Sequence, residues 1–232
     1  MLKAIVFDID GVITNLSHFH FLAWKSIYSF HGVALLHTEW KHYAGKPRLW
    51  IAKEIAKRYK LKLTDKVLGE IVDEKNDLFI HLIKHGLTKN DIINGVKQLI
   101  DHAKERDLKL IAVSTSANAK LEMKCMELNN KFDYISDYSV HQLSSLSAKE
   151  KTNVSNVLFA LHYLGLRTDE CIGLEDHIDG IREYNHVGIY SVAIANYDDT
   201  IKLEANYSVD LPEQINLEEI IFNYYKKDSS DI

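Results

Sequence analysis

Short apolar runs, each followed by polar or acidic residues, recur along the chain. They lie at residues 4–7 (AIVF), 108–114 (LKLIAVS), 170–174 (ECIGL) and 190–195 (YSVAIA). Apolar runs of this length are typical of strands that are buried on both faces of a parallel sheet. Amphipathic helical patterns lie between the later runs, in VKQLIDHAKERD, LEMKCMELN and VSNVLFALHYLGL. Strands that alternate with helices in this way predict an α/β fold with a doubly wound parallel sheet.

One long segment breaks the alternation of strands and helices. Residues 16 to about 88 have an almost wholly helical pattern, with amphipathic runs in HFHFLAWKSIYSFHG, RLWIAKEIAKRYK and KVLGEIVDEKNDLFIHLIK. No strand-like run interrupts them. We therefore predict an α/β core domain of residues 1–15 and 89–232, with a helical cap domain of residues 16–88 inserted directly after the first strand.

Polar residues that can carry chemistry follow three of the predicted strands. They are Asp8 and Asp10, Ser114 and Ser116, and Glu175 and Asp176. Asp, Gly and Asn commonly end strands, so plain strand termination is one interpretation. However, Asp8 and Asp10 lie on the same side of an extended chain, where their charges repel unless a cation neutralises them. Ligands bind beyond the carboxyl ends of strands in such sheets, and Mg²⁺ prefers carboxylate oxygens. The pattern thus also fits metal or phosphate chemistry.

Charge, cysteine content and hydropathy argue against several classes of partner and site. The net charge of −5, from 28 basic and 33 acidic residues, provides no polycationic surface for nucleic acid. Cys125 and Cys171 form no C-x-x-C motif, which argues against a disulfide framework or a zinc site and is typical of a reducing compartment. No apolar run reaches the length of a membrane span, and no signal-peptide pattern precedes the first strand. We expect a cytoplasmic monomer that binds neither nucleic acid nor membrane.

Four segments together resemble the motifs of the haloacid dehalogenase-like superfamily, and the resemblance extends over nearly the whole chain. They are FDIDGVIT at residues 7–14, VSTSAN at 113–118, a lysine near residue 150 and GLEDHIDGI at 173–181. Within the superfamily, the chain looks most like the β-phosphoglucomutases because of the runs HFHFLAWKSI and EKND and the serine-rich second motif. The resemblance implies a phosphoryl-transfer enzyme with a Rossmann-like core and an inserted cap.

This resemblance and the chemistry of phosphoryl transfer together give roles to the strand-end residues. A transferring phosphoryl group needs a nucleophile, a cation and hydrogen-bond donors. Asp8 would attack phosphorus and form an aspartyl phosphate, and Asp10 would move a proton to and from the substrate oxygens. Mg²⁺ would be held by Asp8, Asp10, Glu175 and Asp176. Ser114 would bind phosphate, although its position also fits an ordinary helix N-cap.

The second and third motifs leave alternatives open. Ser116 and Asn118 resemble family positions that help to hold the substrate or its second phosphate, and either could equally be a helix cap. The motif lysine is assigned to Lys151, because counting back 24 residues from Glu175 reaches it, and Lys149 is the alternative. The family usually has K-P-x-P-D at this point, whereas this chain has KTNVS, without a proline to stiffen the loop.

Five residues of the predicted cap resemble substrate-binding positions of the β-phosphoglucomutases. They are His20, Trp24, Gly45, Arg48 and Lys75. Arg48, in AGKPRLW, could grip a second phosphate through its planar guanidinium, and His20 could couple cap closure to proton transfer by Asp10. Trp24 also fits the apolar stripe of a helix that simply packs.

These features give three hypotheses for function. The first is a β-phosphoglucomutase-like isomerase that interconverts β-D-glucose 1-phosphate and glucose 6-phosphate through an aspartyl-phosphate enzyme and a bisphosphate intermediate. The second is a Mg²⁺-dependent phosphatase that hydrolyses a small sugar phosphate, which Ala44, in place of a family lysine, and the altered lysine loop leave open. The third is a non-catalytic phosphate-binding module. His20, Arg48 and Lys75 favour the isomerase, with a small sugar phosphate as its partner.

Overall fold

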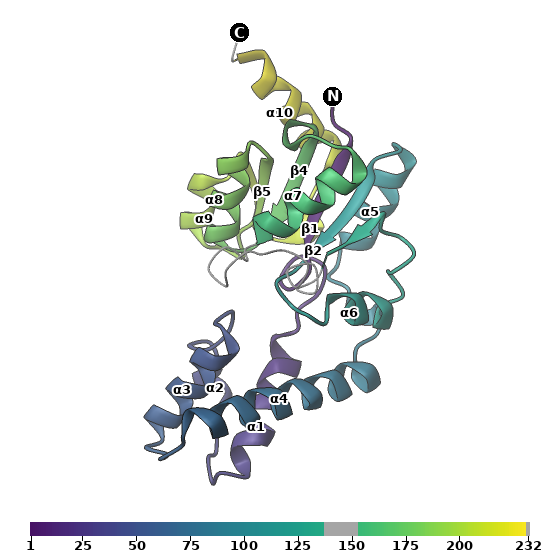
Figure 1. The fold of residues 1–232 in the computed structure, drawn as a ribbon. Helices are drawn as coiled ribbons and strands as arrows, with labels where there is room; N and C mark the ends of the chain where they lie inside the picture. The colour runs from purple at the N-terminus through teal and green to yellow at the C-terminus, as the bar shows by residue number, and fades with distance from the viewer. Residues whose placement is uncertain (137–152, 231–232) are drawn as a thin grey trace. The chain divides into compact units, whose positions relative to one another are not determined.

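The computed structural model describes residues 1–136 and 153–230 of the chain (Figure 1). The chain forms two compact units, one of Met1–Asn15 with Thr88–Ile232 and one of Leu16–Leu87. We call them the core unit and the helical unit. The chain leaves the core unit after Asn15 and re-enters it at Thr88, so the helical unit is an insertion in the sequence of the core unit. Within the described ranges, no helix combines the length and apolar character that crossing a bilayer requires.

The core unit contains a parallel sheet of six described strands in the order β3-β2-β1-β4-β5-β6. The strands are β1 (Ala4–Asp8), β2 (Lys109–Val113), β3 (Tyr134–Ile135), β4 (Cys171–Glu175), β5 (Tyr190–Ile194) and β6 (Tyr207–Val209). The four apolar runs of the sequence form β1, β2, β4 and β5, which confirms the predicted doubly wound α/β fold. The pattern does not predict the edge strands β3 and β6, because they are short and largely half-buried.

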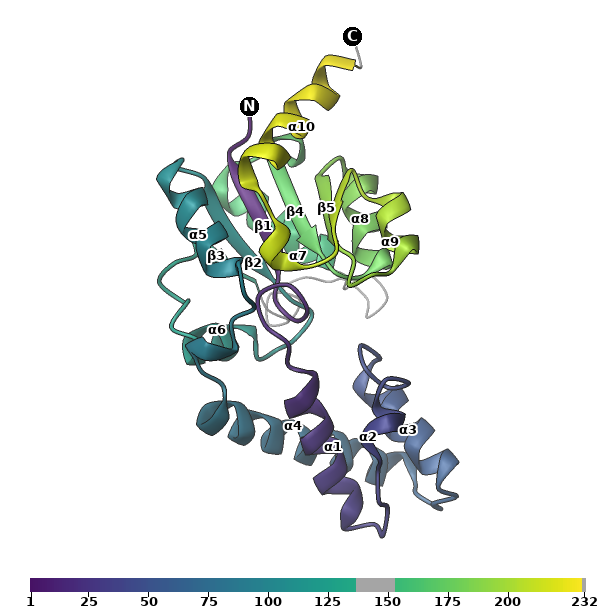
Figure 2. The same cartoon turned by 180° about the vertical axis from the view of Figure 1, so that it is seen from behind.

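Helices cover both faces of the sheet (Figure 1 and Figure 2). The described helices of the core unit are α5 (Val96–Glu105), α6 (Ala119–Cys125), α7 (Asn153–Leu164), α8 (Ile178–Val187), α9 (Asp199–Glu204) and α10 (Leu217–Ser230), with 3₁₀ turns η1 (Lys89–Asp91), η3 (Thr168–Glu170) and η4 (Pro212–Gln214). Helices α7 and α8 lie on one face, and α5 and α10 lie on the other. Alternate residues of a strand point to opposite faces, so Ala4 and Val6 share a cluster with Val157 and Leu161 of α7.

The helical unit has four helices around an aromatic-rich core of its own. They are α1 (Ser17–Ser29), α2 (His37–Trp40), α3 (Arg48–Arg58) and α4 (Asp65–Gly86). Trp24, Tyr28 and Tyr43 are almost fully buried in this core. The Tyr28 hydroxyl donates a hydrogen bond to the backbone oxygen of Ala52 over 2.6 Å, which ties α1 to α3. Trp24 therefore packs in the core of this unit, as the apolar stripe of its helix predicts.

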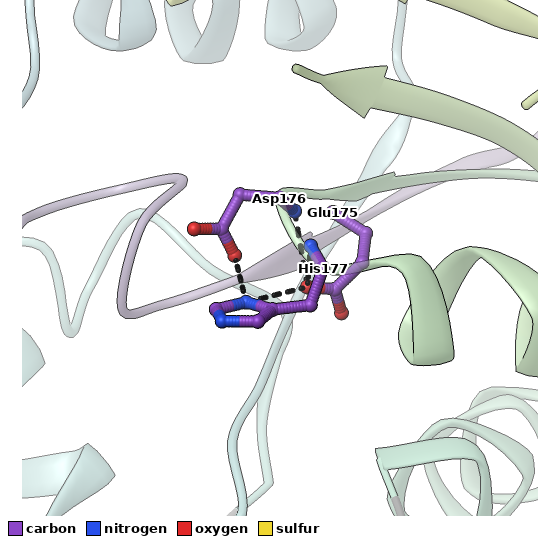
Figure 3. A group of neighbouring side chains, drawn as sticks. All are labelled: Glu175, Asp176 and His177. Carbon is purple, nitrogen blue, oxygen red and sulfur yellow. Dashed lines mark hydrogen bonds and ion pairs between the residues drawn. The ribbon is translucent and has the colours of Figure 1, made fainter. Parts of the chain in front are cut away.

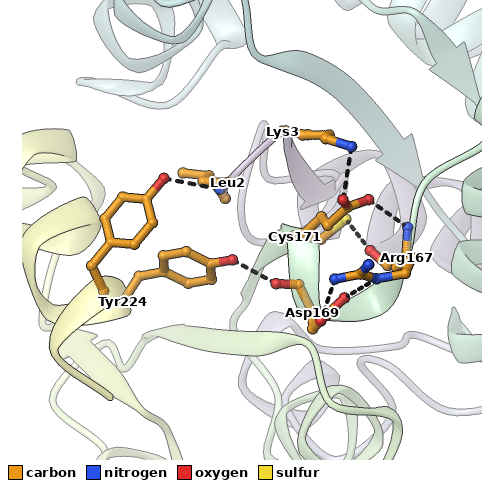
Figure 4. A network of polar contacts seen from close by, with 8 residues as sticks. Leu2, Lys3, Arg167, Asp169, Cys171 and Tyr224 are labelled. Carbon is orange, nitrogen blue, oxygen red and sulfur yellow. Dashed lines mark hydrogen bonds and ion pairs between the residues drawn. The ribbon is translucent and has the colours of Figure 1, made fainter. Parts of the chain in front are cut away.

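A network of polar contacts fixes the amino ends of β1 and β4 (Figure 4). The Lys3 ammonium lies 2.7 Å from a carboxylate oxygen of Glu170. The Tyr224 hydroxyl of α10 donates a hydrogen bond to the backbone oxygen of Asp169. These contacts connect the start of β1 to the segment that enters β4, and they hold α10 against the same end of the sheet. Between these contacts and the carboxyl ends, the two strands pair in register from Ala4 with Cys171 to Phe7 with Leu174.

Gly173 of β4 provides a test of how tightly α8 packs on the sheet. A Cβ at this position would lie 2.6 Å from two ring atoms of Tyr184, which is fully buried. We expect Gly173→Ala to lower the free energy of unfolding by about 1–3 kcal/mol, because the ring has no room to move away. Equilibrium unfolding in urea measures this change.

The control is Gly69→Ala in α4, where nothing lies within 4 Å of the added Cβ. Alanine favours helix over glycine, so this variant should keep its stability or gain up to about 1 kcal/mol. A Gly173→Ala protein as stable as the unmodified one would contradict tight packing at this contact.

Candidate active site

The carboxyl ends of three neighbouring strands meet at the centre of the sheet. Strand β1 lies between β2 and β4, and its last residue, Asp8, pairs with Val113 of β2. Glu175 is the last residue of β4, and Ser114 directly follows β2. The exposed fractions of Asp8, Ser114 and Glu175 are 7%, 6% and 2%. The strand order therefore brings together three buried polar residues that lie far apart in the sequence.

The loop after β1 turns back on itself and approaches Asp176. The Gly11 N–H donates to the backbone oxygen of Thr14 over 2.7 Å, and the Thr14 N–H donates to that of Ile9 over 3.0 Å. Gly11 has a φ of +108°, a region that other residues rarely adopt. A Cβ at Gly11 would also overlap the carboxylate of Asp176. The glycine of D-x-D-G is therefore needed for its backbone conformation and for the space that Asp176 occupies.

The carboxylates at this edge of the sheet repel one another, and this repulsion contributes to raised pKa values of Asp8 and Glu175. Burial raises the pKa of Asp8 well above its ordinary value, and the charges of Glu175, Asp176 and Asp10 raise it further. Burial, followed by the charge of Asp176, raises the pKa of Glu175 to about 8. These four residues therefore form one cluster of mutually repelling charges, which a divalent cation would stabilise.

A histidine to which the sequence analysis gives no role lies at the same site (Figure 3). His177 Nδ1 donates to Asp176 Oδ1 over 2.6 Å, and this hydrogen bond raises the pKa of His177 to about 9. Glu175 Oε1 accepts the backbone N–H groups of Asp176 and His177, whereas Glu175 Oε2 is buried and accepts no hydrogen bond from the described residues. One donor atom from each of the three side chains lies within 4.8 Å of the others. In the sequence, the feature that could have identified His177 as a site residue is its position directly after Glu175 and Asp176.

The loop after β2 satisfies several of its polar groups internally. Ser114 Oγ accepts the Ser116 N–H over 3.0 Å, and Ser116 Oγ accepts the Asn118 N–H over 3.1 Å. Ser116 Oγ also donates to the Glu122 carboxylate of α6 over 3.1 Å. These are local turns of the kind that serines form near the start of a helix. The Ser114 hydroxyl retains its hydrogen, so it keeps the capacity to donate to a phosphate oxygen.

The motif lysine cannot be placed from the described part of the chain. Lys151 and its alternative, Lys149, lie outside the described residues. Asn156 of α7 donates from Nδ2 to the backbone oxygen of Ser114 over 2.8 Å. The first turns of α7 are therefore anchored at the carboxyl end of β2.

In the helical unit, the buried Lys75 forms a pair with the half-buried His20. Lys75 is 1% exposed, and its Nζ donates to His20 Nδ1 over 2.7 Å. The ammonium also lies 4.7 Å from the ring centroid of Phe79 and 5.5 Å from that of Trp24. Burial lowers the pKa of His20 well below its ordinary value, and the charges of Lys75 and Arg48 lower it further. His20 is therefore neutral and accepts the lysine hydrogen.

Arg48 is the first residue of α3, and the turn before it depends on Gly45. Gly45 has a φ of +73°, in the left-handed region that favours glycine. Pro47 then precedes the helix in an extended conformation. The positive charge of Arg48, like that of Lys75, lowers the pKa of His20. We refer to Arg48, Lys75 and His20 together as a group on the basis of this electrostatic effect and of the Lys75–His20 hydrogen bond.

A cavity of about 410 Å³ in the core unit borders the carboxylate cluster. Gly11 and Asp176 line it, together with four asparagines, which are Asn15, Asn90, Asn94 and Asn196. Amide side chains both donate and accept hydrogen bonds, as recognition of a hydroxyl-rich molecule requires. A larger cavity of about 620 Å³ lies along α5, and none of the strand-end carboxylates line it. The smaller cavity is therefore the one that adjoins the site.

The motifs at these strand ends lie within a segment that matches the model of a known protein family. The family model of haloacid dehalogenase-like hydrolases matches residues 2–188, a span that includes β1, β2 and β4. The chain belongs to this family. As a haloacid dehalogenase-like hydrolase, it is a phosphoryl-transfer enzyme.

Individual relatives in this family carry the names of two activities. The chain is 27% identical to "Beta-phosphoglucomutase" of Bacillus subtilis over 195 residues, which cover 83% of each chain. It is 24% identical to "Putative phosphatase YhcW" of the same organism over 201 residues, which cover 84% of each chain. The solved structure of β-phosphoglucomutase from Clostridium difficile has a TM-score of 0.81 at 26% identity, and the match covers 99% of this chain and 100% of that chain. The fold is therefore that of the β-phosphoglucomutases.

Haloacid dehalogenase-like enzymes generally use Mg²⁺, and the residues at the strand ends fit this ion. Mg²⁺ binds carboxylate oxygens, and the cluster supplies four carboxylates whose mutual repulsion a cation would offset. In addition, Glu175 Oε2 is buried without a hydrogen bond from the described residues. A buried carboxylate oxygen in that state is stabilised by a cation nearby.

The contact between Gly11 and Asp176 gives a prediction for metal binding. The added methyl group of Gly11→Ala would displace the Asp176 carboxylate, so we expect the affinity for Mg²⁺ to fall at least about tenfold. Isothermal titration calorimetry measures the affinity directly.

The control is Gly165→Ala, since Gly165 also has a positive φ, of +66°, but has nothing within 4 Å of the added Cβ. This variant also places a side chain at a positive φ, with a smaller backbone strain and without the collision, and its Mg²⁺ affinity should not change. If Gly11→Ala bound Mg²⁺ as tightly as the unmodified protein, Asp176 would not be held in its binding position by this loop.

Proposed function

We propose that the chain is a β-phosphoglucomutase-like isomerase. It interconverts β-D-glucose 1-phosphate and glucose 6-phosphate through an aspartyl-phosphate enzyme and a bisphosphate intermediate. In this proposal the protein is a cytoplasmic monomer with a small sugar phosphate as its substrate. The observation that carries the proposal is the group of Arg48, Lys75 and His20 in the helical unit, because only the isomerase needs to hold a second phosphate.

The core unit carries out phosphoryl transfer in two steps of the same kind. In the first, a carboxylate oxygen of Asp8 forms a bond to phosphorus while the bond from phosphorus to the donor oxygen breaks, and Asp10 gives that oxygen a proton. In the second, a hydroxyl of the sugar attacks the phosphoryl group on Asp8, and Asp10 takes the hydroxyl proton. Asp8 is released unchanged, so the second step is the reverse of the first with a different sugar oxygen.

Asp8 must be ionised to act as a nucleophile, although burial and its neighbours raise its pKa. Asp8, Asp10, Glu175 and Asp176 would hold Mg²⁺, and the bound ion would supply the positive charge that favours ionised Asp8 and offsets the charge of the phosphate. The Ser114 hydroxyl would donate a hydrogen bond to a phosphoryl oxygen. Lys151 would provide a further cation, with Ser116 and Asn118 close to the phosphate.

The helical unit acts as the cap in this proposal. An isomerase must keep its bisphosphate intermediate while the sugar turns around, so it needs a cationic group for the phosphate that is not reacting. Arg48 would bind this phosphate, and the buried ammonium of Lys75 would add a second positive charge to the helical unit. Gly45 would let the loop before Arg48 turn towards the substrate. Neutral His20 accepts a hydrogen bond from Lys75 and so keeps the ammonium in a defined position.

A phosphatase is the second candidate function. It would use the same Asp8 and Asp10 chemistry, with water in place of the sugar hydroxyl as the acceptor. The similarity to YhcW over 84% of the chain favours it, and so does Ala44, which stands where the mutases commonly have lysine.

One assay separates the two activities. The protein is incubated with Mg²⁺, β-D-glucose 1-phosphate and a trace of glucose 1,6-bisphosphate, and glucose 6-phosphate and inorganic phosphate are followed together. An isomerase forms glucose 6-phosphate with little free phosphate, and addition of EDTA stops it. Release of phosphate faster than formation of glucose 6-phosphate would replace the proposed function with hydrolysis.

Asp8→Asn tests the nucleophile for both activities. Asparagine keeps the shape of the side chain but removes the attacking charge, so we expect each rate to fall at least about a thousandfold. The stability should stay the same or rise, because the change removes one of the repelling charges. The matched control is Asp179→Asn, an 89% exposed carboxylate on α8, which should leave both rates unchanged. More than a few per cent of residual activity in Asp8→Asn would rule out the covalent step.

Arg48→Ala tests the cap. Loss of hydrogen bonds from a guanidinium to a phosphate should slow isomerisation about a hundredfold, while hydrolysis changes far less. The ratio of glucose 6-phosphate to inorganic phosphate in the assay above reports this change. Lys46→Ala, which removes a neighbouring charge of the same loop, is the control and should have a smaller effect. An unchanged isomerisation rate in Arg48→Ala would contradict the role of Arg48 in holding the second phosphate.

A further inference from the structure

Two histidines of α4 lie about one turn apart on the same face of the helix. They are His81 and His85, near the end of the long helix of the helical unit (Figure 1). On an α-helix, residues four apart have their Cβ atoms about 5–6 Å from each other. The two imidazole rings lie side by side, with their centroids 4.6 Å apart and their planes tilted by 49°. Nitrogen atoms of both rings are therefore within reach of a single ion.

The two imidazoles have no other partner in the part of the chain that the structure describes. Both residues are exposed, and neither forms a hydrogen bond or an ion pair with a described residue. A neutral imidazole has one ring nitrogen with an available lone pair. Each histidine therefore offers one ligand atom to an ion that arrives from solvent.

The spacing and the ligand type favour ions that bind nitrogen. Two histidines four residues apart on one helix face bind Zn²⁺ in the H-E-x-x-H motif. Zn–N bonds of about 2.0–2.1 Å place two bound nitrogens roughly 3 Å apart, which the separation of the two ring centroids allows. Imidazole suits Zn²⁺, Cu²⁺ and Ni²⁺, whereas Mg²⁺ prefers oxygen ligands. The pair is therefore suited to a different class of ion from the carboxylates of the core unit.

The surroundings of the pair carry charges of both signs. Asp77 is exposed and lies about one turn before His81 on the same helix face, so its carboxylate attracts a cation. The negative end of the helix dipole, in the last turn of α4, also attracts a cation. Lys84, next to His85 in the chain, repels it. Two attractive contributions thus accompany one repulsive contribution.

We propose that His81 and His85 together bind one Zn²⁺ ion, with water completing its coordination. The last carbonyl groups of a helix lack partners within the helix, so its final turn frays readily. An ion bound to both imidazoles would hold this turn in its helical form. Helix α4 ends at Gly86 and the chain re-enters the core unit at Thr88, so the site lies directly before this junction in the sequence. The inference does not depend on the proposed function.

Calorimetry with Zn²⁺ tests the pair. The whole protein is titrated in excess Mg²⁺, which competes for the carboxylates of the core unit. We expect His81→Gln and His85→Gln each to weaken Zn²⁺ binding at least about tenfold, because the second nitrogen binds as an intramolecular ligand. The double variant should lose much less than the product of the two single effects, because either substitution alone already removes the chelate. Circular dichroism checks that the variants are folded.

The matched control is His102→Gln. His102 is exposed and lies in the last turn of α5, but Gln98 and Arg106 stand four residues before and after it, so it has no histidine partner at this spacing. We expect the Zn²⁺ affinity of this variant to equal that of the unmodified protein.

Pulsed electron paramagnetic resonance with one equivalent of Cu²⁺ counts the bound imidazoles. We expect couplings from two imidazoles in the unmodified protein and in His102→Gln, and from fewer than two in His81→Gln and in His85→Gln. Unchanged Zn²⁺ affinity in either of these two variants, or two imidazole couplings that survive in them, would overturn the inference. An equal loss of affinity in His102→Gln would overturn it too, because Zn²⁺ would then bind exposed histidines without selecting the pair. The assay for isomerase and phosphatase activity does not enter these outcomes, so the proposed function and this inference fail independently.

Discussion

Repulsion between buried carboxylates is the constraint on which the site depends. Asp8 and Glu175 end adjacent strands, and burial together with their neighbours raises the pKa of both. The fold brings these charges together by means of two glycines. A Cβ at Gly11 would overlap the Asp176 carboxylate, and one at Gly180 would overlap that of Glu175. Local structure is therefore adapted to hold the carboxylates close, at a cost in free energy that a bound cation would offset.

The rest of the core unit makes this arrangement possible by being rigid. Apolar residues of β1 and β4 are buried between helices on both faces of the sheet, and strand pairing sets the register of their carboxyl ends. At the amino ends, the contacts from Lys3 to Glu170 and from Tyr224 to Asp169 tie the same strands together. In the core unit, the candidate catalytic residues thus lie at the last residue of a strand or in the few residues that follow it.

The helical unit contains a buried positive charge, and it stabilises this charge by a different means. Lys75 is almost fully buried, which is costly for an ammonium group unless partners compensate for lost water. The rings of Phe79 and Trp24 and the nitrogen of His20 are such partners. The same packing that stabilises the unit therefore holds a cation in a defined place.

The sequence by itself determined the parallel sheet, the helical insertion and the acidic strand ends, because a local pattern of apolar and charged residues specifies each of them. It did not reveal the short edge strands β3 and β6, whose pattern is too brief to differ from a loop. Only the tertiary structure decided that His177 turns its ring towards Asp176, and that Lys75 donates to His20, 55 residues away. Periodicity reports which face of an element is buried. Which side chains meet there depends on how distant elements pack.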